Sequence, residues 1–225
     1  MTEAEWLACT SPEPMLAFLR EKVSERKLRL FACSVCRQLA VFVRTEEYNR
    51  GIDRADAYAD GERMKAAMKR SRKALDHRMV SLVDTSGYGE SDEWVSLFLG
   101  TIAISERNYR SFPTCLSDIR SSGRNESVTH IINGCCLNVR DIFGNPFRPV
   151  ALNAARQTST VLSLAQAAYD NRILPAGTLE PARLAVLADA LEEAACDNAD
   201  ILNHLRQPGE HVRGCWAVDL LLGKE

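Results

Sequence analysis

Apolar residues recur at intervals of three and four positions along almost the whole chain, and this spacing most constrains the fold. Clear stripes of this kind occupy residues 28–42, 64–82 and 184–195. Residues spaced in this way lie on one face of a helix, so each stripe predicts an amphipathic helix with one buried side. The alternation of apolar and polar residues that is typical of strands is nearly absent.

Signals for helix starts and stops support this interpretation. Thr2 and Glu5 have the spacing of a capping box, and Ser11-Pro12 is typical of a helix start. We expect one helix over residues 125–143, ended by Gly144 before Asn145-Pro146. The stretch 111–123 has no clear pattern. The sequence thus predicts an all-α fold of about eight to ten helices, arranged as a multi-helix bundle or a short stack of helical hairpins.

The domain organisation has two interpretations. A chain of 225 residues suits one large domain or two small ones. Helical periodicity lapses between Gly144 and Gln157. We therefore predict a helical N-terminal region, 1–143, and a smaller helical C-terminal region, 144–225, with one continuous domain as the alternative.

Composition and the first residues bear on the compartment. The opening MTEAEW carries acids where a secretory signal has bases, and no run of 18 apolar residues occurs. A cytoplasmic protein without a membrane partner is expected. The eight cysteines are then reduced thiols, used as small hydrophobes or metal ligands. A net charge of −2 argues against a surface built wholly for nucleic acid.

Two thiols and two imidazoles near the C-terminus form a candidate metal site. Cys196, His204, His211 and Cys215 fall within 20 residues. Thiolate and imidazole are the ligands of tetrahedral structural zinc sites, so the cofactor implied is Zn²⁺. The spacing matches no standard zinc finger, and the alternative is two buried cysteines with surface histidines. Cys33 and Cys36 form a CxxC in the middle of a predicted helix, which favours core packing over redox chemistry.

Two further segments carry candidate contacts for a partner. Residues 61–78 hold seven Lys or Arg and two acids, and four of these bases share one helical face: Lys65, Lys69, Arg72 and Lys73. Such a face suits phosphates or an acidic protein, the alternative being an ordinary solvated surface. Phe147 and Arg148 stand between two prolines and are residue types that anchor interfaces. The alternative is that Phe147 fills the core and Arg148 binds carbonyls at a helix end.

The sequence carries no familiar catalytic signature. It has no GxSxG, no P-loop, no HExxH and no GxGxxG. Asp189, Glu192 and Glu193 are residue types that serve acid–base chemistry or Mg²⁺ binding in pairs, but a helix puts Asp189 and Glu193 opposite the leucine stripe, so they are expected to face water. These observations favour a non-catalytic role.

Three segments resemble a large bacterial paralogous family of uncharacterised proteins. They are MTEAEWLACTSPEPMLAFLREKVSERKLRLFACSVCR, RDIFGNPFRPV and DNADILNHLRQPGEHVRGCWAVDLLLGKE. The resemblance implies a cytoplasmic, multi-copy lineage and supplies no catalytic residue. Within the chain, Leu187–Glu193 (LADALEE) is similar to a short bacterial domain that accompanies leucine-rich repeats, which implies an interaction or regulatory setting.

The sequence therefore favours a non-catalytic helical module that binds another protein or regulates it. One alternative is a structural zinc module through Cys196, His204, His211 and Cys215. Another is nucleic-acid binding through the basic helix 63–78.

Overall fold

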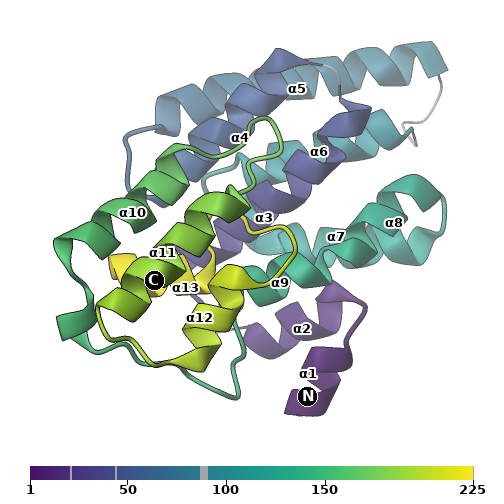
Figure 1. Ribbon diagram of the computed structural model, residues 1–225. Helices are drawn as coiled ribbons and strands as arrows, with labels where there is room; N and C mark the ends of the chain where they lie inside the picture. Colours follow the sequence, from purple (N-terminus) through teal and green to yellow (C-terminus); the bar gives the residue numbers. More distant parts are fainter. Residues whose placement is uncertain (21, 44, 87–90, 225) are drawn as a thin grey trace. The chain divides into compact units, whose positions relative to one another are not determined.

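The described part of the chain is all-α, as the sequence predicts. The structure is a computed structural model that describes residues 1–20, 22–43, 45–86 and 91–224. The only β pairing in these ranges consists of the isolated bridges Ile173–Thr178 and Thr178–Val212. More α-helices form than the predicted eight to ten (Figure 1).

The α-helices and 3-10 helices (η) have the following bounds: α1 Glu3–Ala8, α2 Pro12–Leu19, α3 Glu25–Leu39, η1 Ala40–Phe42, α4 Glu46–Ala59, α5 Lys65–Ser86, α6 Asp92–Ala103, η2 Asn108–Ser111, α7 Phe112–Ser122, α8 Glu126–Gly134, α9 Cys136–Phe143, η3 Ala154–Arg156, α10 Ser159–Asp170, α11 Pro181–Glu193, α12 Ala199–Arg206 and α13 Trp216–Leu222.

The helix predicted over residues 125–143 is instead two helices. α8 ends at Gly134, and the N–H of Cys135 bonds to the carbonyl of Ile132, three residues back rather than four. Glycine is a poor helix former, so the chain can tighten its turn there before α9 begins. The unpatterned stretch 111–123 folds as the end of η2 and α7. Short helices of this kind explain why the count exceeds the prediction.

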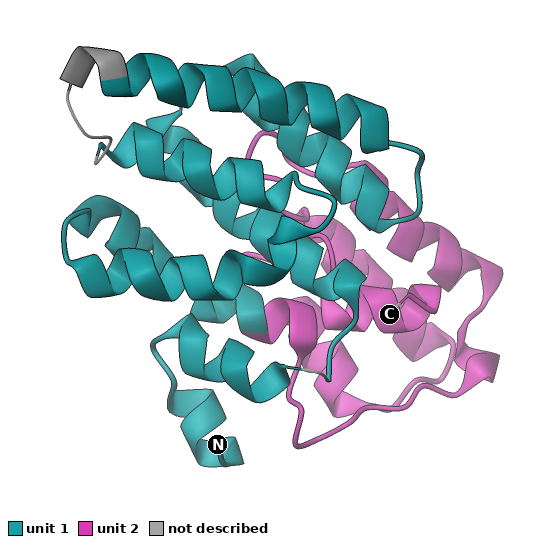
Figure 2. Cartoon of the chain, turned by 180° about the vertical axis from the view of Figure 1, so that it is seen from behind, with its two compact units in different colours: residues 1–139 teal, residues 140–225 magenta. Residues whose placement is uncertain are grey.

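The chain forms two compact units, unit 1 (Met1–Val139) and unit 2 (Arg140–Glu225), shown in Figure 2. The division falls within α9, a few residues before the predicted boundary at 143/144. Compactness alone does not make each unit an independent domain, so the domain organisation stays a prediction.

Unit 1 is built around α3, which packs against α4, α6 and α8. Two buried arginines of α3 make polar contacts inside this unit. Arg37 pairs with Asp53 and Asp56 of α4 at 2.7 and 2.5 Å. Arg29 donates to the carbonyls of Ala103, Ser105 and Glu106, at and just beyond the end of α6. The guanidinium thus satisfies the carbonyl of the last residue of α6 and two carbonyls of the segment that follows it.

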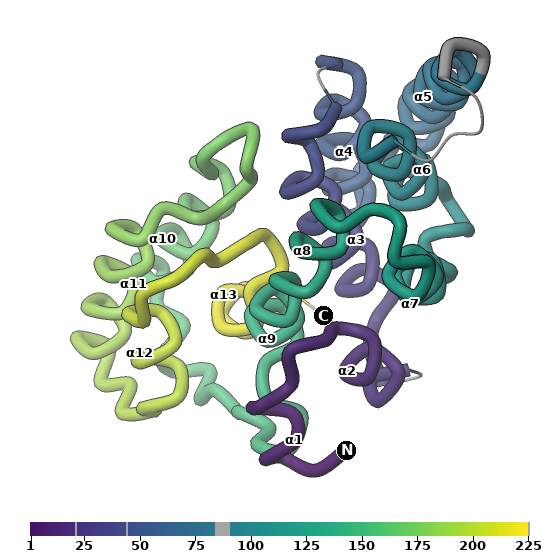
Figure 3. Tube along the Cα trace, turned by 90° about the vertical axis from the view of Figure 1, so that its right-hand side faces the viewer, coloured from purple at the N-terminus to yellow at the C-terminus, as the bar shows by residue number. Residues whose placement is uncertain are grey.

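Unit 2 stacks α10, α11 and α12 side by side, and α13 packs against α10 and α12 (Figure 3). Its core is apolar and includes Val161, Leu184, Leu187 and Ile201. A buried hydroxyl anchors the chain before α13, since Tyr169 accepts the N–H of Gly214 and bonds Asp219 at 2.7 Å. This anchoring fixes the segment that carries the candidate site.

Candidate metal centre

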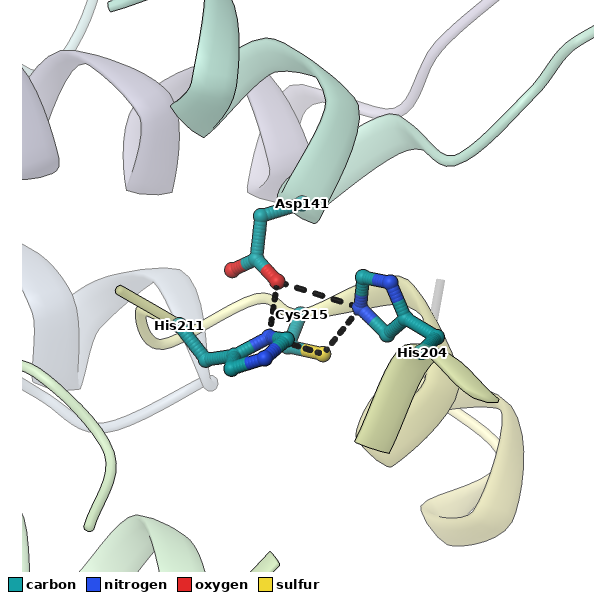
Figure 4. Close-up of side chains that lie close together, drawn as sticks. All are labelled: Asp141, His204, His211 and Cys215. Carbon is teal, nitrogen blue, oxygen red and sulfur yellow. Dashed lines mark hydrogen bonds and ion pairs between the residues drawn. The ribbon is translucent and has the colours of Figure 1, made fainter. Parts of the chain in front are cut away.

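Four side chains of unit 2 converge on one point (Figure 4). Asp141 comes from α9, His204 from α12, His211 from the loop after α12, and Cys215 from the residue before α13. Each offers one ligand atom, and these atoms all lie within 4.8 Å of one another. This is the one such group of three or more His, Cys, Asp or Glu side chains among the described residues.

Asp141 and His204 define the centre of the group. Oδ1 of Asp141 lies 2.6 Å from Nδ1 of His211 and 3.1 Å from Nε2 of His204. The same Nε2 lies 3.2 Å from Sγ of Cys215. Sγ is 4.0 Å from Nδ1 of His211. One carboxylate oxygen, one sulfur and two ring nitrogens thus lie around a common point.

The end of α9 positions Asp141. Gly144 follows the helix with φ at 67°, the left-handed conformation that favours glycine at a helix end. A Cβ at this position would lie 3.1 Å from Cγ of Trp216, so any larger residue would also crowd the indole. The N–H of Val212 binds Oδ2 of Asp141 at 2.8 Å. This bond holds one carboxylate oxygen and leaves Oδ1 to contact His204 and His211.

The last turn of α12 positions His204. Asn198 caps the start of this helix by accepting the N–H groups of Asp200 and Ile201. The imidazole packs 4.9 Å from the ring of Trp216, measured between centroids. Its Nδ1 lies 3.1 Å from Nε2 of Gln207. The ring is therefore oriented on both edges.

Backbone bonds to the neighbouring loop fix His211 and Cys215. The N–H of Leu179 binds the carbonyl of His211 at 2.7 Å, and Val212 pairs with Thr178. The N–H of Cys215 binds the carbonyl of Val212, which closes a turn. The turn brings two ligand side chains four residues apart to the same place.

Burial makes the charges of this group matter. The exposed fractions of the side chains are 5% for Asp141, 3% for His211 and 11% for His204. Burial alone would raise the pKa of Asp141, but the bonds and charges of His204 and His211 outweigh it and lower that pKa. Burial likewise opposes a charge on His211, but the bond to Asp141 raises its pKa above the usual value. Asp141 is therefore held as a carboxylate beside His211, whose pKa is raised.

The geometry suits a metal ion better than a thiol nucleophile. In a catalytic triad, the histidine directs one ring nitrogen at the nucleophile and the other at the orienting carboxylate. Here Nε2 of His204 faces both Asp141 and Cys215. Cys215 has no exposed surface, so no substrate can reach its sulfur. Ligand atoms that face a common centre are what a bound cation needs.

Three of the four predicted ligands, His204, His211 and Cys215, lie in this group, and Cys196 does not. Cys196 is part of the apolar core of unit 2, and its N–H binds the carbonyl of Leu191. Asp141 takes the fourth place, and sequence reasoning missed it. A signal existed, because an acid in the last turn of a helix opposes the helix dipole and needs a compensating partner.

The predicted basic face lies on α5 and is partly neutralised. Lys65 pairs with Glu106, and Arg72 lies 3.8 Å from Asp76. Lys69 and Lys73 are exposed. Partner binding by this face stays a prediction, with fewer uncompensated charges than the sequence indicates.

Phe147 and Arg148 lie in a turn after α9. Oδ1 of Asn145 accepts the N–H of Phe147, and its carbonyl accepts the N–H of Arg148. Phe147 is half-buried and Arg148 is exposed. An anchoring role for either also stays a prediction.

Unit 1 has a groove of about 500 Å³ that includes one of the predicted residues, Arg72. The rings of Trp94 and Phe98 stack along it, 5.5 Å apart and 9° from parallel. Asp76 and Cys115 also line it. Among the described residues, this groove holds no converging set of ligand atoms.

The remaining predictions concern cysteines and membranes. None of the eight cysteines forms a disulfide. Cys33 and Cys36 are buried in α3, and burial raises the pKa of Cys36 to about 12, so this CxxC has the environment of core cysteines. No helix in the described ranges has the length and apolar character to cross a membrane.

Comparisons of the chain with protein-family models, with curated proteins and with solved structures give no match. The resemblance to a bacterial paralogous family stays a prediction.

Proposed function

We propose that unit 2 is a helical module stabilised by a structural zinc ion, with Asp141, His204, His211 and Cys215 as ligands. The observation that carries the proposal is the convergence of four ligand atoms from four separate segments within 4.8 Å. Nε2 of His204 faces the carboxylate and the thiol together, which supports a common centre between them.

The donor set and its spacing favour zinc. Zinc binds cysteine, histidine and carboxylate ligands at about 2.0–2.3 Å, so the ligand atoms of a tetrahedral site lie about 3.3–3.8 Å apart. The ligand atoms of this group lie from 2.6 Å to at most 4.8 Å apart, a range that includes these distances. Calcium and magnesium require mainly oxygen ligands, and this group offers one carboxylate.

Burial supports a structural rather than a catalytic role. A catalytic zinc keeps one position open for water or substrate, whereas a structural zinc has four protein ligands. Here all four positions come from the chain, and Cys215, Asp141 and His211 are buried. We infer that the module acts by binding a partner on a surface that the ion holds rigid, in line with the interaction role that the sequence favours.

The test is the metal content of protein purified without chelator and without a nickel column. We expect about one zinc per chain, and loss of this zinc in Cys215→Ser. Cys196→Ser is the matched control, since it removes another buried thiol of the same core. It should retain the metal.

Thermal unfolding completes the test. Zinc present at 100 times its Kd should stabilise the folded wild type by up to about 2.7 kcal/mol, the value reached when the unfolded chain binds no zinc, and should not stabilise Cys215→Ser. Cobalt in place of zinc should give the visible bands and the thiolate charge-transfer band of a tetrahedral site. Folded protein that neither contains zinc nor is stabilised by it would contradict the proposal.

A further inference from the structure

The two ring nitrogens of His204 have different surroundings. Nε2 faces Oδ1 of Asp141 and Sγ of Cys215, inside the proposed site. Nδ1 faces the side-chain amide of Gln207, at 3.1 Å. Gln207 is the residue that ends α12, and its own N–H binds the carbonyl of Asn203 at 2.8 Å. The backbone of Gln207 is therefore held one helical turn beyond His204, and its exposed amide reaches the imidazole from there.

Metal binding decides which nitrogen of His204 carries the proton. A nitrogen that binds an ion must offer its lone pair, so zinc on Nε2 requires the proton on Nδ1. A protonated Nδ1 is a donor and needs an acceptor. Gln207 can supply one, because its amide has an oxygen as well as a nitrogen and fits the same space after a half turn.

Without the ion the same contacts favour the opposite arrangement. Nε2–H donates to the carboxylate of Asp141, and Nδ1 accepts from the NH₂ of Gln207. The amide orientation and the ring tautomer thus change together when a metal binds.

We propose that Gln207 is a positioning residue of the metal site, whose amide oxygen accepts Nδ1–H of His204 and fixes the tautomer that binds zinc. The inference rests on the proposed zinc site. His204 is the most exposed of its three nitrogen and oxygen ligands, and outer partners of this kind orient a metal-binding histidine. The outer partner of Asp141 is the backbone N–H of Val212, which no side-chain substitution can remove.

Zinc affinities of two variants at this position test the proposal. Gln207→Leu removes the acceptor and should weaken zinc binding by about 10–100-fold. Gln207→Glu is the same size and only accepts, so it should bind zinc more tightly than the wild type. Asn203→Asp adds the same charge at another exposed position of α12 and should change the affinity less than Gln207→Glu does. Competition with a zinc-binding dye measures all four Kd values.

The outcomes separate this inference from the proposed function. A wild type that binds no zinc overturns both. A wild type that binds zinc, with Gln207→Leu equally tight or Gln207→Glu weaker than Gln207→Leu, overturns the inference alone. If Gln207 has only a structural role at the helix end, both variants should lower the melting temperature of the metal-free protein and should have the same zinc Kd. That result would also overturn the inference.

Long-range proton–nitrogen correlation spectra of the histidine rings provide the direct readout. In the zinc-bound wild type, His204 should carry its proton on Nδ1. After chelation in alkaline buffer, the proton should move to Nε2. A zinc-bound ring with an unprotonated Nδ1 would overturn the proposal, because the amide oxygen would then have no hydrogen to accept.

Discussion

At the scale of single residues, Asp141 shows how a local disadvantage can indicate a site. It occupies the last turn of α9, where the helix dipole disfavours a negative charge, and it is buried. Two imidazoles and the N–H of Val212 compensate for both costs. The contacts of Asp141 with these groups explain why an acidic residue is tolerated at this buried helix end.

Gly144 gives a prediction at this scale. Gly144→Ala should destabilise the protein by about 1–3 kcal/mol, because alanine disfavours a φ of 67° and its Cβ would lie 3.1 Å from Trp216. Urea unfolding measures the loss. Gly134→Ala is the control, since a Cβ there meets nothing within 4 Å, and it should be neutral or stabilising. Equal effects of the two substitutions would contradict this account.

Sequence reasoning named three of the four side chains that the structure brings together, and these three are close in the chain. His204, His211 and Cys215 lie within a dozen residues, so their residue types alone indicate a metal. Asp141 lies far earlier, and only the packing of α9 against the loop before α13 brings it in. Cys196 was predicted for its type and nearness, but it lies in the apolar core, which sequence spacing does not reveal.

At the scale of secondary-structure elements, caps connect stability to the site. Asn198→Ala should cost about 1 kcal/mol, because it leaves the first N–H groups of α12 without an acceptor. It should also weaken zinc binding, since α12 carries His204. The control is Ser24→Ala, which removes the matching cap of α3 in unit 1.

Both capping variants should lose similar stability, and only Asn198→Ala should change the zinc Kd. Urea unfolding and dye competition measure the two effects. A zinc Kd that changes equally in both variants would mean that affinity follows general stability rather than the placement of His204.

The sequence predicts helices well where periodicity and caps agree. The capping box of Thr2 and Glu5 is present, and Ser24 caps α3. It predicts them poorly where one stripe crosses a short break. The stripe from Val128 to Ile142 is continuous, yet the helix is interrupted at Cys135. The spacing of apolar residues indicates which face of a helix is buried, but it does not reveal a single tightened turn that divides the helix in two.

At the scale of the whole molecule, raising the pH should lower the stability of the metal-free protein and raise the stability that zinc adds. In the metal-free protein the pKa of His211 is raised, so its pairing with Asp141 stabilises fully below the unfolded histidine pKa and is lost as pH rises through the folded value. The pKa of Asp141 is lowered, so its contribution is present above the unfolded carboxyl pKa and is lost as pH falls through the folded one.

We therefore expect the metal-free protein to lose stability between about pH 6 and 8, near the ordinary histidine pKa. The increment from zinc should grow over the same range, because zinc binds neutral imidazole and thiolate. Urea unfolding with chelator and with excess zinc, at several pH values, gives the slope of metal-free stability against pH and the slope of the zinc increment against pH. Slopes of the same sign would contradict the prediction, and Asp141→Asn should flatten the metal-free one.

The uneven spacing of the ligands has a consequence for the unfolded chain. His204, His211 and Cys215 are near enough in sequence to capture zinc before the chain folds, whereas Asp141 joins only when α9 packs in place. A metal bound by both states stabilises only by the difference between the two affinities. If zinc binds as proposed, Asp141 would supply much of that difference, and the three neighbouring side chains would bind the ion early in folding.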